Sequence, residues 1–340
     1  MGCGIVALDR LWTDDAAPPI APTDRESIAA VQSLLLGHGF SAMPTVLSRN
    51  CGVYGPQTIT AIQTFQSAQD LGATGVVDRP TLKALAAVRA KTPIVSTAYT
   101  AFVLQLDTTG LLRPATVTMQ FEGGGRFGAA NLNTDRAGLS FGLIQWAQRP
   151  GRLHELLDGF QRADPAQFIK TFGDGDPLLA QGLLTHTATP NGGVDPLTGA
   201  TRDPKYDLID ATWQRRFQAA GQETAFQRAQ ITTALAAFGA SARRIRNSMP
   251  QVVSERALVF MLDVANQFGD AGAQSVVSTV MKTLKAGATE ADFLAAVGGE
   301  TVARVARQFG AASKEAQATS NRRDIIQTSP LLSDSPAIFS

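Results

Sequence analysis

Glu122 is the residue whose setting in the sequence points most directly to chemistry. The segment around it predicts a helix that begins at Pro114, because proline is favoured at a first helical position, and ends at the run Gly123-Gly124-Gly125. Glu122 then lies in the last turn, where the partial negative charge of a helix C-terminus opposes ionisation of a carboxyl group. Desolvation by Phe121 and Trp146 acts in the same direction, so we expect a raised pKa for Glu122, as a general acid requires.

A second carboxylate, Asp135, follows in a segment of asparagine, threonine and arginine residues that keeps it charged. A protonated and an ionised carboxyl group on two sides of a cleft are the minimal equipment for hydrolysing a glycosidic bond. The competing interpretation is a frayed helix end followed by a solvated aspartate in a loop. The pattern of these residues alone leaves both interpretations open.

The same stretch contains a competing motif, Gly138-Leu139-Ser140-Phe141-Gly142, which fits the G-x-S-x-G pattern of a nucleophile elbow. Such an elbow needs an apolar strand before the serine, but residues 131–137 are polar. Only His154 and His186 follow Ser140, and both are close in sequence, whereas an esterase of that fold places its histidine far downstream. The esterase interpretation is therefore disfavoured.

Metal chemistry has little support in the sequence. The three histidines, His38, His154 and His186, form no H-E-x-x-H motif, and Asp174-Gly175-Asp176 is too short for a calcium loop. We expect the histidines to be surface or capping residues and the protein to use neither a metal nor a cofactor. Carboxylates then remain as the candidate catalysts.

The composition is that of a globular protein with more than one domain. Of 340 residues, 44% are hydrophobic and 17% charged, and 30 lysines and arginines against 29 acidic residues give a net charge of +1. This charge supplies no basic stripe for nucleic acid, and no apolar run reaches the length of a membrane span. Residues 1–10 lack a signal-peptide pattern, and Cys3 and Cys51 cannot build a disulfide framework. We expect a soluble monomer made in the cytoplasm, with no nucleic-acid partner and no membrane insertion.

The first hundred residues predict a small helical module. Residues 1–22 show no period and predict a tail, and a capping box formed by Thr23 and Glu26 then starts the first helix. Two further helices follow glycine-rich turns, which completes a module over residues 23–90 with no internal repeat. The module is electrically neutral and has polar turns, which favours an uncharged, hydroxyl-rich ligand; the alternative is that these are simply turn residues.

Residues 91–112 predict a linker, and residues 113–332 predict a second, mainly helical domain. The helices expected from the apolar period span 153–160, 206–220, 223–238, 254–268, 288–297 and 300–309. The pair Gly298-Gly299 is expected to divide the last two. The stretch 185–206, dense in proline, glycine, aspartate and threonine, predicts a loop or a small hairpin that is either functional or disordered.

Residues 27–88 resemble the peptidoglycan-binding domain found at the end of many wall hydrolases. The pieces that carry the resemblance are Ala30-Val31-Gln32-Ser33-Leu34-Leu35, Gly52-Val53-Tyr54-Gly55-Pro56-Gln57-Thr58, Ala61-Ile62-Gln63-Thr64-Phe65-Gln66 and Gly75-Val76-Val77-Asp78-Arg79-Pro80-Thr81. One departure is Cys51, which stands where the family usually has aspartate before G-x-[FY]-G-P-x-T. The resemblance implies peptidoglycan as the partner of this module.

The second domain, from residue 113 to about 332, resembles the chitosanase-type branch of the lysozyme superfamily, which includes phage endolysins and bacterial wall-degrading effectors. The pieces that carry this resemblance are Phe121–Gly124, the motif from Asp135 to Trp146, Ser254–Leu258 with Asp263–Gln267, and Arg322–Ile326. It implies that Glu122 is the general acid, that Asp135 on the following hairpin is the general base, and that Ser140 helps to hold the attacking water. Chitosanases have an arginine two residues after the aspartate; here Ala137 takes that place and Arg136 is adjacent. This departure weakens the case for a glucosamine-binding cleft.

The sequence therefore predicts a mainly α protein, with a three-helix peptidoglycan-binding module followed by a two-lobed lysozyme-like domain that has a small β-hairpin. The expected reaction is hydrolysis of the β-1,4 bond between N-acetylmuramic acid and N-acetylglucosamine, with the inversion that the resemblance implies. Asn133, Gln145 and Trp146 are the predicted sugar contacts, with a place in the core as the alternative for Trp146.

Three alternatives remain open: a chitosanase, a lytic transglycosylase that uses the same acid, and a non-catalytic wall-binding protein. The predicted place of action is the cell wall. Without a visible signal peptide, a wall hydrolase would reach its substrate through holin-dependent release or a secretion machine.

Overall fold

The computed structural model describes residues 6–45, 48–87, 93–96, 99–107, 110–133, 136–329 and 331–336. The α-helices are α1 Val6–Thr13, α2 Arg25–Gly37, α3 Pro56–Ala68, α4 Arg79–Ala87, α5 Leu112–Gly123, α6 Arg152–Ala163, α7 Pro165–Gly173, α8 Pro177–Ala188, α9 Ala211–Ala220, α10 Thr224–Ser248, α11 Glu255–Met281, α12 Glu290–Phe309 and α13 Lys314–Thr328. The strands are β1 Ala130–Leu132, β2 Leu139–Phe141 and β3 Trp146–Ala147. The expected mainly α fold is confirmed.

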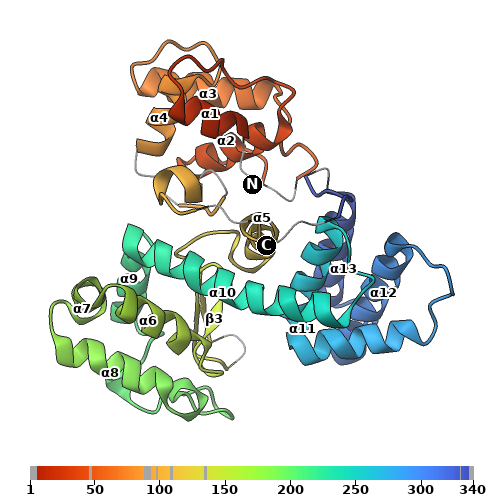
Figure 1. The fold of residues 1–340 in the computed structure, drawn as a ribbon. Helices are drawn as coiled ribbons and strands as arrows, with labels where there is room; N and C mark the ends of the chain where they lie inside the picture. The colour runs from red at the N-terminus through yellow and green to blue at the C-terminus, as the bar shows by residue number, and fades with distance from the viewer. Residues whose placement is uncertain are drawn as a thin grey trace.

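Helices α1 to α4 form the N-terminal module, at the top of Figure 1. Helix α2 begins after Asp24, whose carboxylate accepts from the backbone N–H of Ser27 at 3.1 Å. The predicted capping box of Thr23 and Glu26 is therefore wrong. Glu26 instead forms an ion pair with Arg113 of the second domain, so its carboxylate points away from the start of its own helix.

Two buried glutamines hold the turns of this module in the same way. Each accepts a hydrogen bond from a glycine N–H and donates to the carbonyl of the next valine and to a threonine hydroxyl. The partners, at 2.8–3.0 Å, are Gly52, Val53 and Thr58 for Gln32, and Gly75, Val76 and Thr81 for Gln66. The prediction of no internal repeat is thus wrong: the unit is a helix followed by a turn.

Residues 6–13, expected to belong to a tail, form helix α1. Leu8 and Leu11 are fully buried, and α1 lies against α2 and α4. The ring of Trp12 stacks on Phe102 with centroids 4.9 Å apart. A helix this short shows too few apolar residues for its period to be visible, so only the partners of its leucines reveal it.

The predicted linker, residues 91–112, is also packed where the structure describes it. A π-helical turn, η1, spans Tyr99–Val103 and buries Tyr99 and Phe102. The hydroxyl of Tyr99 donates to the side-chain oxygen of Gln227 on α10 at 2.8 Å. This segment therefore connects the two domains through buried contacts.

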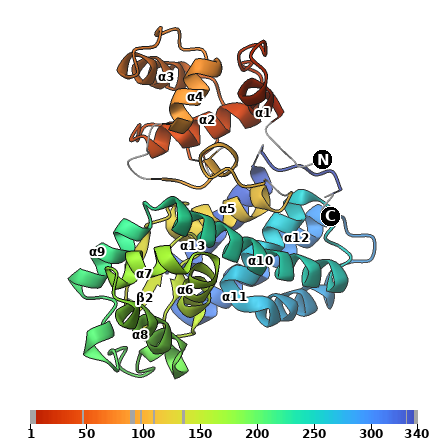
Figure 2. The same cartoon turned by 60° about the vertical axis from the view of Figure 1, so that its left-hand side comes forward.

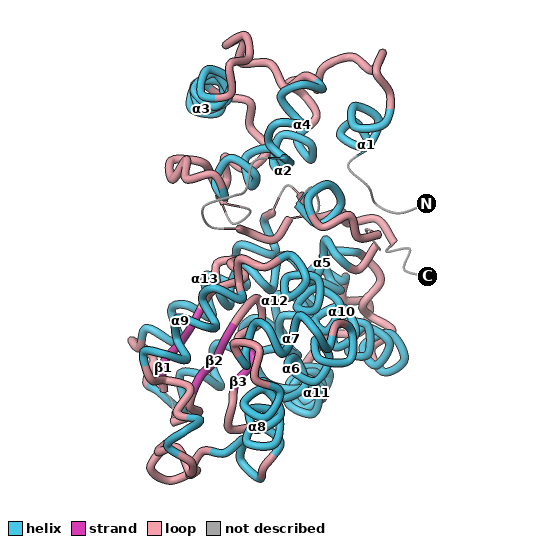
Figure 3. The backbone as a smooth tube through the Cα atoms, turned by 90° about the vertical axis from the view of Figure 1, so that its left-hand side faces the viewer, coloured by secondary structure: helices cyan, strands magenta, loops and turns pink. Residues whose placement is uncertain are grey.

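The second domain has two lobes with α5 and α10 between them (Figures 1 and 2). One lobe contains α6 to α9 and the small sheet, which Figure 3 shows beside these helices, and the other contains α11 to α13. The sheet is antiparallel in the order β1-β2-β3, with Asn131 opposite Ser140 and Phe141 opposite Trp146. The core of the first lobe is a cluster of phenylalanine rings: Phe141, Phe160, Phe168, Phe172, Phe217 and Phe226.

Several predicted boundaries change for reasons of packing. The pair Gly298-Gly299 does not divide a helix, because α12 runs through it from Glu290 to Phe309. Helix α11 bends at Gly269, whose φ is 71°. In the stretch 185–206, α8 continues to Ala188, and an antiparallel bridge joins Val194 to Thr201, as a small hairpin would.

Candidate active site

The three glycines after Glu122 end helix α5 and let two other segments approach it. A Cβ atom at Gly123 would lie 2.9 Å from Cβ of Ala129 and 3.0 Å from the carbonyl oxygen of Gly142. Gly124 is the C-cap and has a φ of 64°, in the left-handed region that favours glycine. The predicted place of Glu122 in the last turn of a helix is confirmed, and the helix end lies against the flanks of β1 and β2.

The Glu122 carboxylate is held by side chains from two other helices. Its Oε1 accepts from Nδ2 of Asn266 on α11 at 3.0 Å and from the guanidinium of Arg322 on α13 at 2.8 Å. The side chain keeps 22% of its surface exposed. Three helices far apart in sequence therefore converge on one carboxylate that solvent can reach.

Arg322 is shared between Glu122 and a second carboxylate, Asp263, which is fully buried on α11. Arg322 donates to both oxygens of Asp263, at 2.5 and 3.2 Å, and Arg323 forms a further ion pair with it. Burial opposes the charged form of Arg322, but the carboxylates of Asp263 and Glu122 outweigh it and raise the pKa of Arg322. Two carboxylates and two guanidinium groups thus form one connected cluster.

No role is predicted from the sequence for Asp263, Asn266 or Arg322, although all three lie in the segments that carry the resemblance of the second domain. One signal was available: Asp263 interrupts the apolar run Leu258–Ala265, and a buried carboxylate requires a charged partner. The partner's identity was not visible, because Arg322 follows 59 residues later on another helix.

The predicted hairpin is present in strands β1 and β2. Asn133 closes its turn: the side-chain oxygen accepts from the N–H of Gly138 at 3.0 Å, and the Asn133 N–H donates to the Gly138 carbonyl at 2.8 Å. Ser140 is buried in β2. Asp135, the predicted general base, lies outside the described residues.

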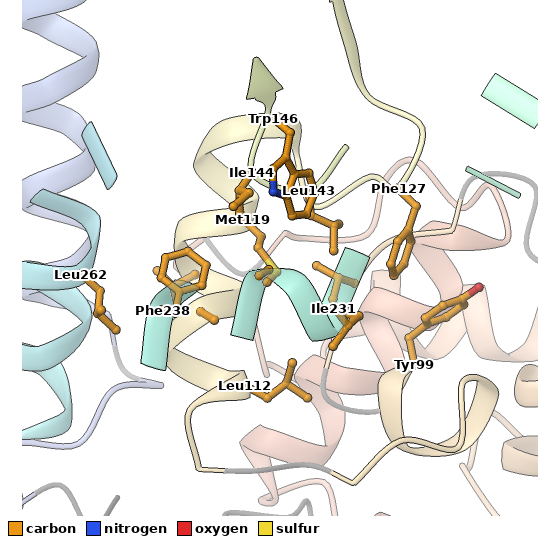
Figure 4. Close-up of a cluster of buried hydrophobic side chains, with 14 of the residues drawn as sticks. Tyr99, Leu112, Met119, Phe127, Leu143, Ile144, Trp146, Ile231, Phe238 and Leu262 are labelled. Carbon is orange, nitrogen blue, oxygen red and sulfur yellow. The ribbon is translucent and has the colours of Figure 1, made fainter. Parts of the chain in front are cut away.

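The predicted sugar contacts have other partners. Asn133 binds within its own turn, and Nε2 of Gln145 donates to the carbonyls of Gly142 and Ala129 at 3.0 and 3.3 Å. Trp146 is 1% exposed and packs in the core with Leu143, Ile144 and Met119 (Figure 4). Trp146 therefore takes the alternative place considered for it, in the core.

Gln230 on α10 is a further buried residue of the site that the sequence did not indicate. Its side-chain oxygen accepts from the N–H of Leu143 at 3.1 Å, and its amide nitrogen donates to the carbonyl of Phe127 at 2.9 Å. The two bonded segments follow α5 and β2. Gln230 thereby joins the end of the Glu122 helix to the end of the strand that carries Ser140.

Other chemistries find no support in the described part of the chain. Ser140 lies in the middle strand of an antiparallel sheet, not at the strand-to-helix turn of a nucleophile elbow. Across the described ranges, no group of three or more histidine, cysteine, aspartate and glutamate side chains is placed to hold a metal ion. His38 and His154 instead bind a backbone carbonyl and a threonine hydroxyl. Among the same residues, no helix has the length and apolar character of a membrane span.

Residues 24–85 match a family model described as "Putative peptidoglycan binding domain". The match covers α2, α3 and all but the last two residues of α4, and it lies within the predicted range 23–90. The chain therefore carries an N-terminal peptidoglycan-binding domain, which supports association with the cell wall. In the comparison with curated proteins, nothing matches the chain.

Proposed function

We propose that this protein is a peptidoglycan hydrolase that cleaves the β-1,4 bond between N-acetylmuramic acid and N-acetylglucosamine. The observation that carries the proposal is the Glu122 carboxylate, partly exposed at the end of α5 and fixed by Asn266 and Arg322. The peptidoglycan-binding domain of the same chain supports a cell-wall substrate. The N-terminal domain would thus hold the protein on the same polymer that Glu122 is proposed to cleave.

In this mechanism Glu122 protonates the leaving oxygen, while Asp135 activates a water molecule held with Ser140. The proposal follows the inverting route, which needs carboxyl groups about 6.5–9.5 Å apart. In the sequence, Asp135 lies between β1 and β2, the two paired strands of the hairpin that the resemblance expects to carry the base.

The cluster around Glu122 gives the proposed acid a fixed orientation. A carboxylate with two donors on different helices loses the freedom to rotate, and effective catalysis depends on reacting groups that are already placed. Asp263 balances part of the positive charge that Arg322 and Arg323 bring. The Asp263 carboxylate gives both buried guanidinium groups a charged partner, so the cluster supports the site without a large cost of unpaired charge.

One observation favours peptidoglycan over chitosan as the substrate. Arg136, adjacent to the position where chitosanases have their arginine, donates to the carbonyl of Leu197 at 2.8 Å, and Ala137 at that position is buried. The arginine next to the hairpin is therefore engaged with the protein. A chitosanase remains the second candidate because it would use the same acid and base.

The test is the digestion of purified sacculi, with mass spectrometry of the soluble products and a reducing-sugar assay on chitosan in parallel. The proposal predicts muropeptides with a reducing N-acetylmuramic acid end. Anhydro-muramic acid ends would identify a lytic transglycosylase, and release of sugar from chitosan alone would identify a chitosanase. Binding to sacculi with no product from either substrate would identify a non-catalytic wall-binding protein.

A further inference from the structure

Gln148, which directly follows β3, is buried and brackets one residue of strand β2. Its backbone N–H donates to the carbonyl of Leu139 at 2.8 Å, and its side-chain Oε1 accepts from the Leu139 N–H at 3.1 Å. Gly138 fits beside this amide because it has no side chain: a Cβ there would lie 2.4 Å from Oε1 of Gln148. Both backbone groups of the residue before Ser140 therefore bond to Gln148.

The orientation of this amide is compatible only with a neutral His186 ring. Since Oε1 of Gln148 accepts from Leu139, the NH₂ group of Gln148 is the end that faces Nε2 of His186, 3.3 Å away. An amide NH₂ group only donates, so Nε2 must accept and the ring proton must be on Nδ1. A charged imidazolium would set two donors against each other. The contact thus requires neutral His186.

The surroundings of His186 favour that neutral form. The ring is buried near the end of α8 and stacks on Tyr206, with centroids 5.4 Å apart. Burial lowers the pKa of His186, and the carboxylates of Asp203 and Asp207 act in the opposite direction. Gly193 packs on the ring, since a Cβ there would lie 2.3 Å from Nε2.

Residues 190–203, which we call the platform loop, carry further contacts with the hairpin. Arg149 donates to the carbonyl of Pro196 at 3.0 Å, and Arg136 donates to that of Leu197 at 2.8 Å. The stretch that the sequence predicts as either functional or disordered is therefore bonded to the chain on both sides of β2. The platform loop packs on His186, His186 contacts Gln148, and Gln148 bonds to strand β2, so the three together support this strand.

We propose that Gln148 and His186 are positioning residues that hold strand β2, and with it Ser140, in the place that turnover requires, and that they do so only while His186 is neutral. The inference rests on the proposed function, in which Ser140 helps to hold the attacking water. It adds a pH-sensitive support that lies outside the Glu122 cluster.

Two substitutions of His186 separate positioning from general stability. In His186→Gln the amide oxygen can accept from Gln148 but does not titrate, whereas His186→Leu removes the acceptor. We expect His186→Gln to keep kcat near neutral pH and His186→Leu to lose about tenfold or more in kcat, with KM little changed. A His186→Leu variant with unchanged kcat would overturn the proposal. Gln181→Leu, at an exposed position of the same helix α8, is the control and should behave as the wild type.

The pH profile supplies a readout that a purely structural role would not move. Because burial lowers the pKa of His186 from its ordinary value of 6.5, the support is complete above that pH and is lost as pH falls below it. The ratio of His186→Gln to wild-type kcat should therefore rise below pH 6.5, since ionisation of the acid and base is common to both proteins and cancels. A ratio that stays constant with pH would overturn the role of neutral His186.

Hydrogen exchange decides the inference even if the proposed function fails. Peptides covering residues 136–148 should exchange faster in Gln148→Leu and His186→Leu than in Gln181→Leu at the same pH, because the Leu139 N–H loses its fixed acceptor. Unchanged exchange in both variants would overturn the support. A wild-type protein that cleaves neither peptidoglycan nor chitosan would instead refute the proposed function, whatever the exchange result.

Discussion

Arg322 and Glu122 lie 200 residues apart in the chain and form an ion pair at 2.8 Å. The same guanidinium binds buried Asp263, and its Cζ atom lies 4.8 Å from the centroid of the Phe121 ring. Arg322 on α13 therefore orients the Glu122 carboxylate at the end of α5, and Asp263 on α11 holds Arg322 in place. This relationship sets the first two predictions.

Arg322→Lys should impair turnover more than binding. A lysine ammonium keeps the charge but lacks the planar fork that contacts two carboxylates together, so Glu122 loses its fixed orientation. We expect kcat on peptidoglycan to fall about 10- to 100-fold with KM little changed. Steady-state kinetics on solubilised peptidoglycan measures this. Arg304→Lys, in an ion pair within α12, is the control, and an unimpaired Arg322→Lys enzyme would show that the ion pair does not position Glu122.

Asp263→Asn should lower the stability of the second domain. The substitution removes the counter-charge that Arg322 and Arg323 share in a buried setting, and breaking such a pair costs about 3–5 kcal/mol of unfolding free energy. Urea denaturation followed by circular dichroism measures the loss. Asp324→Asn, on the exposed face of α13, should change stability little, and equal effects of the two substitutions would contradict the account.

Leu11→Ala tests whether α1 belongs to the folded N-terminal module. The side chain is fully buried, so its truncation should cost about 2–5 kcal/mol. Thermal unfolding of the full chain measures the change, with exposed Arg10→Ala as the matched substitution on the same helix. If Leu11→Ala melts like the wild type, the N-terminal residues are a tail after all.

The thiol of Cys51 should react slowly in the folded protein. Burial raises its pKa to about 11, so at pH 8 only about one thiol in a thousand is the reactive thiolate. Alkylation by iodoacetamide should be more than about 100-fold slower than in urea and should accelerate as pH rises towards 11. Peptide mass spectrometry separates Cys51 from Cys3. Equal rates in native and unfolded protein would show that Cys51 is accessible.

What the sequence predicts well here is local. The end of the helix at Glu122 follows from three consecutive glycines, and the hairpin is implied by the resemblance that the motif from Asp135 to Trp146 carries. Both depend on residues close together in the chain. For the same reason, the module of residues 23–90 agrees with the matched range 24–85.

What the sequence did not predict depends on distant partners. Arg322 becomes part of the site only because α13 packs on α11, and α1 is recognisable only once its leucines have a core to enter. Trp146 illustrates the same limit, since an indole beside a glycine-rich turn suits a sugar contact and a core equally well until burial is known. The repeat built on Gln32 and Gln66 was missed although both turns share the spacing Gly-Val-x-x-x-x-Thr; the bonds of the two glutamines show why the spacing recurs.

The most direct test of the central claim is the rate at which Glu122→Gln releases soluble muropeptides from purified sacculi. The amide preserves the size of the side chain and an oxygen for Arg322, so folding and sedimentation with sacculi should match the wild type. Turnover should fall by about 10²–10⁴-fold because the leaving oxygen loses its proton donor. Glu155→Gln, exposed on α6, should retain full activity. A Glu122→Gln protein that releases muropeptides at the wild-type rate would contradict the account.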